Sequence, residues 1–408
     1  MKNKHKVLLL IDTSRGSGRK LLYGISKYSR LHGPWIFNRK SVYFLDYQTK
    51  FRKFQHLEEE TLSQLHKWGA DGVIATNINN KNQFDRIIGM GIPSVILGGY
   101  EPNKPIPRWH RVRSDSDAIG TLAAEHLLGC GFRNFAYCGY NKLIWSEERG
   151  ACYAKRIKKA GFETIFYQPP LRKTKGRLLY EPNAIADWLK SLPRPLGLFA
   201  CNDDRAQNVL EACKIVNLEV PEEIAVIGVD DDRLVCEVSE PELSSIQLNN
   251  ERAGYEAAEL LSKLMKGKKL PHQEIVVEPT GIVIRKSTDQ LAIEDPDVAD
   301  AVRFIREHAM EVIQVSDVVE QVPMSRRSLE RSFRSLLNRS VFEEIKRIHV
   351  DQFSKMLLET NMTISQIAWC LGHPDSQNIS RYFREAKGMS PGAYRKKHGR
   401  ILRDVEGF

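Results

Sequence analysis

The chain has 408 residues, more than one ordinary hydrophobic core accommodates, which predicts two or three domains. Its 42% hydrophobic and 27% charged residues are typical of soluble globular proteins, and no apolar run has the length of a signal peptide or membrane span, so we expect a cytoplasmic protein without membrane partners. Seven cysteines, an odd number without a CxxC pair, exclude a disulfide framework and a zinc site.

The net charge of +10 favours a polyanionic partner, and its distribution is uneven. Residues 301–408 contain 18 Lys+Arg and 13 Asp+Glu, a net charge of +5 in 108 residues. The first 300 residues contain 43 Lys+Arg and 38 Asp+Glu, so the same +5 is spread almost three times more thinly. The basic density therefore lies at the C-terminus.

Residues 6–285 alternate short apolar runs with amphipathic stretches such as 118–131, which ends at a glycine. Near-continuous apolar strands that alternate with helices predict a parallel sheet covered on both faces, and their number is sufficient for two lobes. The predicted strands are 6–12, 72–76, 94–99, 134–139, 196–203 and 225–231.

The glycine-containing loop at 12–20 lies between the first predicted strand and a helix, as in nucleotide-binding proteins. The spacing of Gly16 and Gly18 does not match a P-loop, which needs four residues between its first Gly and Gly-Lys-Ser/Thr. The dinucleotide fingerprint requires a third glycine where this chain has Leu21. We therefore expect no nucleotide cofactor.

Polar side chains follow several predicted strands at their carboxyl ends, where open α/β sheets bind ligands. Short acids, amides and a bidentate arginine can each pair with two adjacent sugar hydroxyls, and a tryptophan can cover the apolar face of the sugar ring. The candidate effector-binding residues are Asp12, Trp145, Arg149, Asn202, Asp203 and Asp230.

Each of these positions also has a structural interpretation. Asp12 and Asn202 are equally well explained as turn or helix-capping residues. Asp115 is expected to cap the helix that follows it, and Asp231 and Asp232 are expected to be solvated. Arg149 and Asp230 remain the strongest candidates.

A boundary follows the α/β pattern. Residues 287–301 contain five acids and one proline and no Lys or Arg. The acids are Asp289, Glu294, Asp295, Asp297 and Asp300. We interpret 287–300 as a linker that leads into a helix. Strand patterns end there, so 301–400 is predicted to be all-α, followed by a tail at 401–408.

The C-terminal region contains an internal repeat with an offset of 50 residues. SLERSFRSLLNRS (328–340) aligns with NISRYFREAKGMS (378–390). A fixed offset is typical of a duplicated unit. The matching pairs are Leu329/Ile379, Arg331/Arg381, Phe333/Phe383, Arg334/Arg384 and Ser340/Ser390.

Each copy predicts a helix with one apolar and one cationic face, in which Leu329, Phe333 and Leu336, or Ile379, Phe383 and Ala386, face inward. Shorter amphipathic pieces (315–322 and 364–371) precede these helices, separated from them by Pro323-Met324 and Gly372-His373-Pro374, which is the helix-turn-helix plan. A solvated arginine face is the alternative for one copy, but repetition in the same phase favours DNA binding. The candidate DNA-binding residues, with Ser325 and Asp375 expected as caps, are Ser325, Arg326, Arg327, Arg331, Arg334, Gln377, Asn378, Arg381 and Arg384.

The segment IAWCLGHPDSQNISRYFREAKGMSPGAYRKK (367–397) resembles the signature of AraC-type regulators. His373 and Asn378 depart from it, at positions where Phe and Tyr are usual. The resemblance covers about the last 100 residues. It implies seven helices, a long one near 342–358 between two helix-turn-helix units, and binding in two successive major grooves about 34 Å apart.

The preceding region resembles the LacI/GalR-type effector domain, which is similar to periplasmic sugar-binding proteins. The resemblance is carried by residues 112–139, 196–214 and 220–232. It implies that Arg149, Asn202-Asp203 and Asp230 contact the effector. Leu248 stands where that family often has Gln, with Gln247 one place earlier. The family's N-terminal DNA-binding helices are not found here, so we expect the C-terminal region to take their role.

Together these features predict a two-lobed α/β sensor like a periplasmic binding protein (1–286), followed by an all-α domain with two helix-turn-helix motifs. The expected function is that of a sugar-responsive transcription factor, an activator of pentose catabolic genes with D-xylose as the favoured effector. The expected partners are double-stranded DNA, the sugar, RNA polymerase and a second copy of the chain, with no cofactor or metal.

Two alternatives remain open. One is a DNA-binding regulator that responds to a small molecule other than a sugar, such as a nucleobase or a sugar phosphate. The other is an α/β enzyme that processes a sugar, although the sequence shows no nucleophile–His–acid set and such an enzyme would leave the basic repeat unexplained. We therefore expect a regulator rather than an enzyme.

Overall fold

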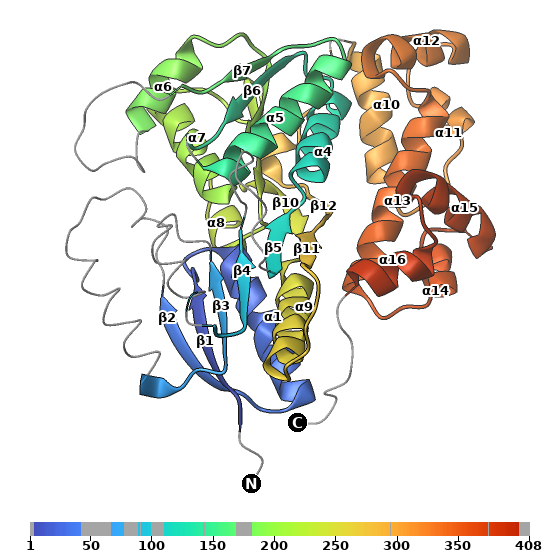
Figure 1. Cartoon of the computed structure of the whole chain (residues 1–408). Coiled ribbons are helices and arrows are strands. Elements are labelled where there is room, and N and C mark those ends of the chain that lie inside the picture. Colours follow the sequence, from blue (N-terminus) through green and yellow to red (C-terminus); the bar gives the residue numbers. More distant parts are fainter. Residues whose placement is uncertain are drawn as a thin grey trace. The chain divides into compact units, whose positions relative to one another are not determined.

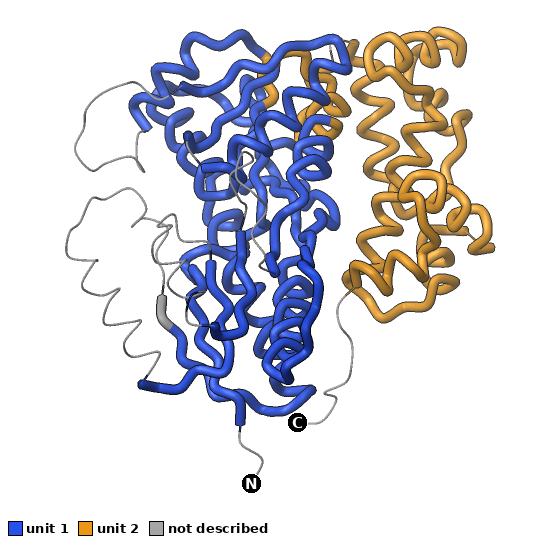
Figure 2. The backbone as a smooth tube through the Cα atoms, viewed as in Figure 1, with its two compact units in different colours: residues 1–124, 135–194, 198–288 blue, residues 125–134, 195–197, 289–408 orange. Residues whose placement is uncertain are grey.

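The computed structural model describes residues 4–41, 67–76, 89, 91–98, 110–141, 143–168, 182–293, 295–373 and 375–399. The chain forms two compact units: residues 1–124, 135–194 and 198–288, and residues 125–134, 195–197 and 289–408 (Figure 2). Glu294, Pro374 and the predicted tail 401–408 lie outside the described residues. Within the described ranges, no helix is both long and apolar enough to span a bilayer.

The first unit contains two six-stranded sheets among its described residues, each covered by helices (Figure 1). The first sheet is parallel, in the order β11-β5-β4-β3-β1-β2. We call the lobe around it the first lobe. Its strands are β1 (Lys6–Ile11), β2 (Ile36–Ser41), β3 (Gly72–Thr76), β4 (Ser94–Leu97), β5 (His110–Ser114) and β11 (Glu274–Val277).

Helices α1 (Gly16–His32) and α9 (Asn250–Met265) of the first lobe pack tightly against each other. A β-carbon added at Gly24 would lie 1.8 Å from the Glu251 carbonyl oxygen, and one at Gly254 would lie 2.0 Å from that of Leu21. Only glycine permits this approach. The contact fixes the first residues of α9 relative to the loop after β1.

The second sheet has the order β12-β10-β9-β8-β6-β7, and β12 pairs antiparallel to β10 with an irregularity at Gln247/Leu248. We call the lobe around it the second lobe. Its strands are β6 (Asn134–Cys138), β7 (Thr164–Phe166), β8 (Leu196–Ala200), β9 (Ile224–Val229), β10 (Ser244–Leu248) and β12 (Pro279–Val283). Its helices are α4 (Ser116–Gly129), α5 (Ile144–Lys159), α6 (Pro182–Lys190), α7 (Asp203–Ile215) and α8 (Arg233–Cys236).

The six strands predicted from sequence correspond to β1, β3, β4, β6, β8 and β9. The prediction missed six others. Four of them (β2, β7, β11 and β12) are sheet edges, where half-solvated strands lack a continuous apolar run. The other two, β5 (HRVRS) and β10 (SSIQL), are rich in polar residues.

The second unit contains seven described helices from α10 onwards and no described strand after residue 300, as predicted. Its two hydrophobic cores are centred on Leu329 and Phe333 and on Ile379 and Phe383. Ala386 was expected to face inward but is exposed, because the buried face of its helix ends at Phe383. The helices are α10 (Pro296–Glu307), α11 (Val315–Glu320), α12 (Arg326–Leu337), α13 (Val341–Glu359), α14 (Ile364–Cys370), α15 (Ser376–Lys387) and α16 (Pro391–His398).

A buried ion cluster stands at the start of α13. The Glu344 side chain is 0% exposed and pairs with Arg339 at 2.6 Å and Arg347 at 2.7 Å. These two arginines, with Arg306, hold the pKa of Glu344 at about 2 against the opposing effect of its burial. Arg339 also donates to the Gly129 carbonyl at 3.2 Å. The cluster thus fixes the connection between α12 and α13.

Candidate effector cavity and nucleic-acid interface

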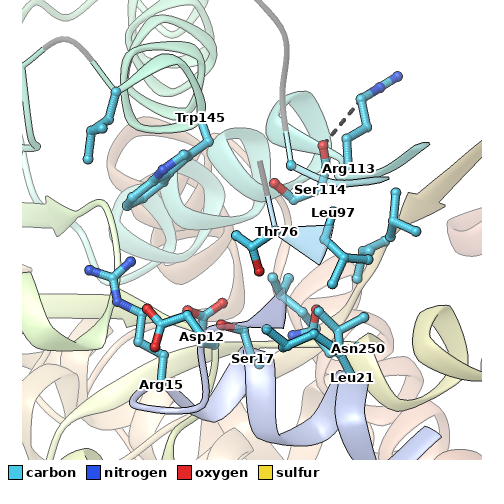
Figure 3. A pocket seen from close by; sticks show the side chains of 18 of the residues that line it. Asp12, Arg15, Ser17, Leu21, Thr76, Leu97, Arg113, Ser114, Trp145 and Asn250 are labelled. Atoms are coloured by element: carbon cyan, nitrogen blue, oxygen red, sulfur yellow. Dashed lines mark hydrogen bonds between the residues drawn. The ribbon is translucent and has the colours of Figure 1, made fainter. Parts of the chain in front are cut away.

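A cavity of about 230 Å³ lies between the two lobes of the first unit (Figure 3). The first lobe contributes the carboxyl ends of β1, β3, β4 and β5 and the first turns of α1 and α9. The second lobe contributes the first turns of α5 and the loop after β9. Its polar and charged lining residues are Asp12, Arg15, Ser17, Thr76, Arg113, Ser114, Glu148, Arg149, Asp230 and Asn250.

Arg149 and Trp145 enter the cavity from α5. Arg149 is 5% exposed, and its Nη1 donates to the Cys201 carbonyl at 2.6 Å. Its guanidinium lies 5.1 Å from the centre of the Trp145 ring, and that of Arg15 lies 5.7 Å from the same ring. Among the described residues, Arg149 Nε has no hydrogen-bond partner. Buried donors in native proteins are nearly always hydrogen-bonded, so this N–H is available to a group that enters the cavity.

Asp230 lines the cavity from a strained backbone position. Its φ is +109° and that of Asp231 is +47°, a conformation that non-glycine residues rarely adopt. The loop is held because the Asp230 N–H donates to the Ile246 carbonyl at 2.9 Å and its carbonyl accepts from Lys20 Nζ at 2.8 Å. Burial raises the pKa of Asp230, although Arg149, Arg15 and Lys20 act in the opposite direction. Strain of this kind is typical of functional sites.

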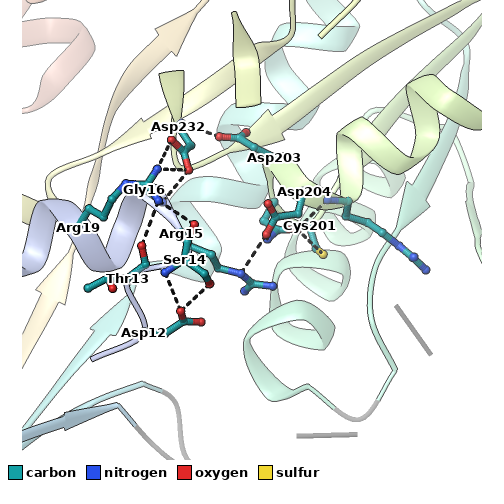
Figure 4. Close-up of polar contacts among 12 residues, drawn as sticks. Asp12, Thr13, Ser14, Arg15, Gly16, Arg19, Cys201, Asp203, Asp204 and Asp232 are labelled. Carbon is teal, nitrogen blue, oxygen red and sulfur yellow. Dashed lines mark hydrogen bonds and ion pairs between the residues drawn. The ribbon is translucent and has the colours of Figure 1, made fainter. Parts of the chain in front are cut away.

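Asn202 and Asp203 lie at the same edge of the sheet but do not line the cavity. Asn202 caps α7 by accepting from the Arg205 N–H at 3.1 Å. Asp203 accepts from the Ser245 hydroxyl at 2.5 Å and from the Asp232 N–H at 2.8 Å (Figure 4). Burial raises the pKa of Asp203 well above its ordinary value. Both side chains therefore form hydrogen bonds with other groups of the protein.

Asp231 and Asp232 are buried, so the expectation that they are solvated was wrong. Asp231 pairs with Arg285 at 2.8 Å. Asp232 pairs with Arg19 at 2.5 Å and accepts from the Gly16 N–H at 2.8 Å (Figure 4). These partners are distant in sequence, and no local pattern indicates them.

Asp12 forms a turn, as one of its two predicted interpretations requires, and it lies where the other interpretation, effector binding, places it. Its Oδ1 accepts from the Ser14 N–H at 2.9 Å, which is a turn-forming contact, and the residue also lines the cavity. Asp115 caps α4 as predicted, through a 3.0 Å bond from the Ala118 N–H.

Sequence reasoning missed seven polar lining residues: Arg15, Ser17, Thr76, Arg113, Ser114, Glu148 and Asn250. Two of them carried a usable signal, because Glu148 precedes Arg149 and Asn250 opens a helix directly after a strand. Leu248 lines the cavity, whereas the Gln247 side chain contacts Asp231 at 3.4 Å and Thr280 at 3.0 Å. The departure from the LacI/GalR pattern at these positions therefore places an aliphatic group in the cavity wall.

The two cationic helices of the second unit are α12 and α15. Ser325 caps α12 with a 3.2 Å bond from the Ser328 N–H, and Asp375 caps α15 with a 2.9 Å bond from the Gln377 N–H, as predicted. At their other ends, Asn338 and Gly388 occupy the same left-handed position 50 residues apart. The exposed polar residues include Arg326, Arg327, Arg331 and Arg334 on α12, and Gln377, Asn378, Arg381 and Arg384 on α15.

His373, which replaces the usual Phe of the AraC-type signature, packs edge-on against His349 with ring centres 5.4 Å apart. Burial lowers the pKa of both rings, and the neighbouring His373 ring lowers the pKa of His349 further. The His373 ring thus occupies the position of the aromatic side chain.

Two family models match the chain. A periplasmic binding protein-like domain matches residues 124–288, and a helix-turn-helix domain matches residues 318–397. The xylose operon regulatory protein of Escherichia coli (strain K12) is 27% identical over 98% of this chain and 99% of its own length. The protein of the same name from Haemophilus influenzae is 28% identical over 96% of this chain and 98% of its own length.

Two solved structures are also similar to this chain. The structure of the xylose-binding transcription activator xylR is 27% identical, covers 98% of this chain and 100% of its own, and superposes with a TM-score of 0.59. The transcriptional regulator CelR in complex with cellobiose covers 70% of this chain and 86% of its own, with 20% identity and a TM-score of 0.56. At that identity the second likeness shows the fold of the first unit alone.

Proposed function

Because the chain joins a periplasmic-binding-protein-like domain to an AraC-type helix-turn-helix domain, as the sequence predicted, we propose that it is a transcription regulator that binds D-xylose in the cavity of its first unit. The observation that carries the proposal is the similarity to xylose operon regulators over 98% of the chain. The relatives reported above are regulators, and the chain is accordingly a regulator rather than an enzyme.

The charges of the cavity favour a neutral polyol over a sugar phosphate. Two of its three lining arginines are already paired with carboxylates outside the lining: Arg15 with Asp204 at 3.0 Å (Figure 4), and Arg113 with Glu274. Three carboxylates line the same space, so the balance is acidic. An added phosphate would meet repulsion there. The lining acids are Asp12, Glu148 and Asp230.

The exposed arginines of α12 and α15 support binding to duplex DNA. Arginine donates to phosphates and pairs bidentately with guanine, while the Gln377 and Asn378 amides match adenine edges. We assign to the two helices the role of entering successive major grooves. A sugar changes DNA affinity only if it binds the DNA-competent form more tightly than the other form.

We also propose that the chain acts as a homodimer in the cytoplasm and activates transcription through RNA polymerase. Light scattering on the full chain, with and without D-xylose, measures the dimer. In vitro transcription from a promoter that carries the selected DNA site measures activation. A monomer at all concentrations, or repression on addition of the sugar, contradicts these parts of the proposal.

The central experiment is calorimetry of the full chain against D-xylose, L-arabinose, D-ribose, D-glucose and D-xylose 5-phosphate. We expect D-xylose to bind most tightly and the phosphate to bind least. A duplex selected by the protein from a random pool then reports whether D-xylose changes DNA affinity. Preference for the phosphate, or no binding of any neutral sugar, overturns the effector assignment.

A further inference from the structure

The side chain of Asn250 is a buried amide that lines the cavity and whose Nδ2 has no hydrogen-bond partner among the described residues. Asn250 is the first residue of α9 and is 4% exposed. Figure 3 labels Asn250 and Leu21 among the residues that line the cavity. Leu97, Leu248 and Val277 line it as well. The amide is therefore a polar group in a wall that also contains several aliphatic side chains.

The start of α9 does not explain this amide. The residue at the cap position is Asn249, and the helix begins with a backbone bond from the Ala253 N–H to the Asn249 carbonyl at 3.1 Å. Tight packing of α1 against Gly254 fixes the helix independently of the Asn250 side chain. A buried amide without a partner is unfavourable in the folded chain, and native proteins retain such groups where a ligand or water completes them.

We propose that Asn250 binds the effector through one hydroxyl group and selects effectors that carry an oxygen at that position. This inference depends on the proposed function, in which a neutral sugar occupies the cavity. A hydroxyl suits the site because it both donates and accepts, and half a turn of the amide presents either Nδ2 or Oδ1. A methylene at the same place leaves the amide unpaired.

With Asn250 included, both lobes contribute hydrogen-bonding side chains to the effector. Asn250 belongs to the first lobe, through α9. Arg149, whose Nε is also unpartnered, and the strained Asp230 belong to the second lobe. A hydrogen bond to this buried amide discriminates against a missing hydroxyl, because the amide is then left unpaired.

The test is Asn250→Leu in the full chain. Asn250→Ala is a second variant, which covers the case that the leucine side chain does not fit in the cavity wall. Without sugar, we expect the melting temperature to stay equal or rise, because the variant removes an unpaired buried donor. The affinity for D-xylose should fall about 10-fold to 100-fold, the size expected when a buried partner is lost. A variant that is less stable but binds as tightly as the wild type overturns the inference.

Gln247→Leu is the matched control, since it makes the same amide-to-leucine change at a residue of β10 that does not line the cavity. Gln247 contacts Asp231 and Thr280. Its replacement should lower the melting temperature and leave the D-xylose affinity unchanged. The two variants are thus expected to move stability and affinity in different directions.

Monodeoxy analogues of D-xylose identify the contacted hydroxyl. The wild type should discriminate against each analogue, whereas Asn250→Leu should lose discrimination at one position and keep it at the others. An equal loss of affinity for every analogue overturns the role in selection. If the wild type binds no neutral sugar, the proposed function falls with this inference; if it binds them and the variant matches it, only this inference falls.

Discussion

The Ser245 hydroxyl donates a 2.5 Å hydrogen bond to the Asp203 carboxylate and accepts one of 3.0 Å from the Asp231 N–H. Asp203 also accepts from the Asp232 N–H. One buried carboxyl group therefore organises the loop that carries Asp230 into the cavity. Asp203 does not itself line the cavity, so its influence on the cavity passes through the backbone of residues 230–232.

Replacement of Asp203 by Asn should make the stability of the first unit less dependent on pH. Burial raises the pKa of Asp203 in the folded chain, whereas an unfolded aspartate titrates near about pH 4. Its contribution to stability is thus fully present below that pH and is lost as the pH rises through the folded pKa. In denaturant unfolding between pH 4 and 8, the free energy of unfolding of the variant should rise relative to that of the wild type as the pH increases. A constant difference contradicts this.

Asp230→Gly should stabilise the chain without effector and abolish effector binding. Glycine adopts a φ of +109° without strain, and such strain costs about 1–3 kcal/mol. We expect the unfolding free energy of Asp230→Gly to exceed that of Asp230→Ala by about 1 kcal/mol, because alanine keeps the backbone strain. Both variants should lose D-xylose affinity in calorimetry. Equal stability of the two variants would show that the backbone is relaxed.

Glu344→Gln should destabilise the second unit by about 3–5 kcal/mol at neutral pH, because it leaves Arg339 and Arg347 without their buried anion. The folded pKa of about 2 lies below the unfolded value, so this contribution is present above about pH 4.5 and is lost as the pH falls toward 2. Hydrogen exchange of the α13 amides measures it. Asp351 is an exposed partner of Arg347, so Asp351→Asn should change the free energy of opening that exchange measures by less than about 1 kcal/mol.

Arg331→Ala and Arg381→Ala should each weaken DNA binding and leave effector affinity unchanged. If the side chain contacts a phosphate, the slope of log affinity against log salt should fall by about 1; if it contacts a base, about 1–3 kcal/mol of sequence discrimination is lost. Binding titrations over a range of salt separate these cases. Arg303→Ala is the control, because Arg303 is exposed on α10 and paired with Asp300. Unchanged DNA affinity of the two variants rejects the role of the repeat.

The sequence was sufficient to predict the continuous apolar strands of both sheets and the helical repeat, but it missed the polar interior strands β5 and β10. Buried strands such as GVIAT are continuous apolar runs, and the 50-residue offset places Phe333 and Phe383 in equivalent cores. Ser325 and Asp375 were found because capping is local. Edge strands such as β2 escaped prediction because solvent covers part of their surface.

The cavity was predicted less completely because a strand end locates a residue but not the direction of its side chain. Asp12, Trp145, Arg149 and Asp230 line the cavity, whereas Asn202 turns to its own helix. Asp231 and Asp232 form ion pairs with Arg285 and Arg19. These contacts join segments far apart in the chain, so only the fold brings them together.

The repeat has diverged in its chemistry while keeping its backbone. Helix α12 exposes four guanidinium groups, and α15 exposes two together with the Gln377 and Asn378 amides. If both helices enter major grooves, as proposed, the duplex sequence that suits α12 differs from the one that suits α15. A site bound by both helices then has a direction, and reversing the site relative to a promoter reverses the chain bound to it.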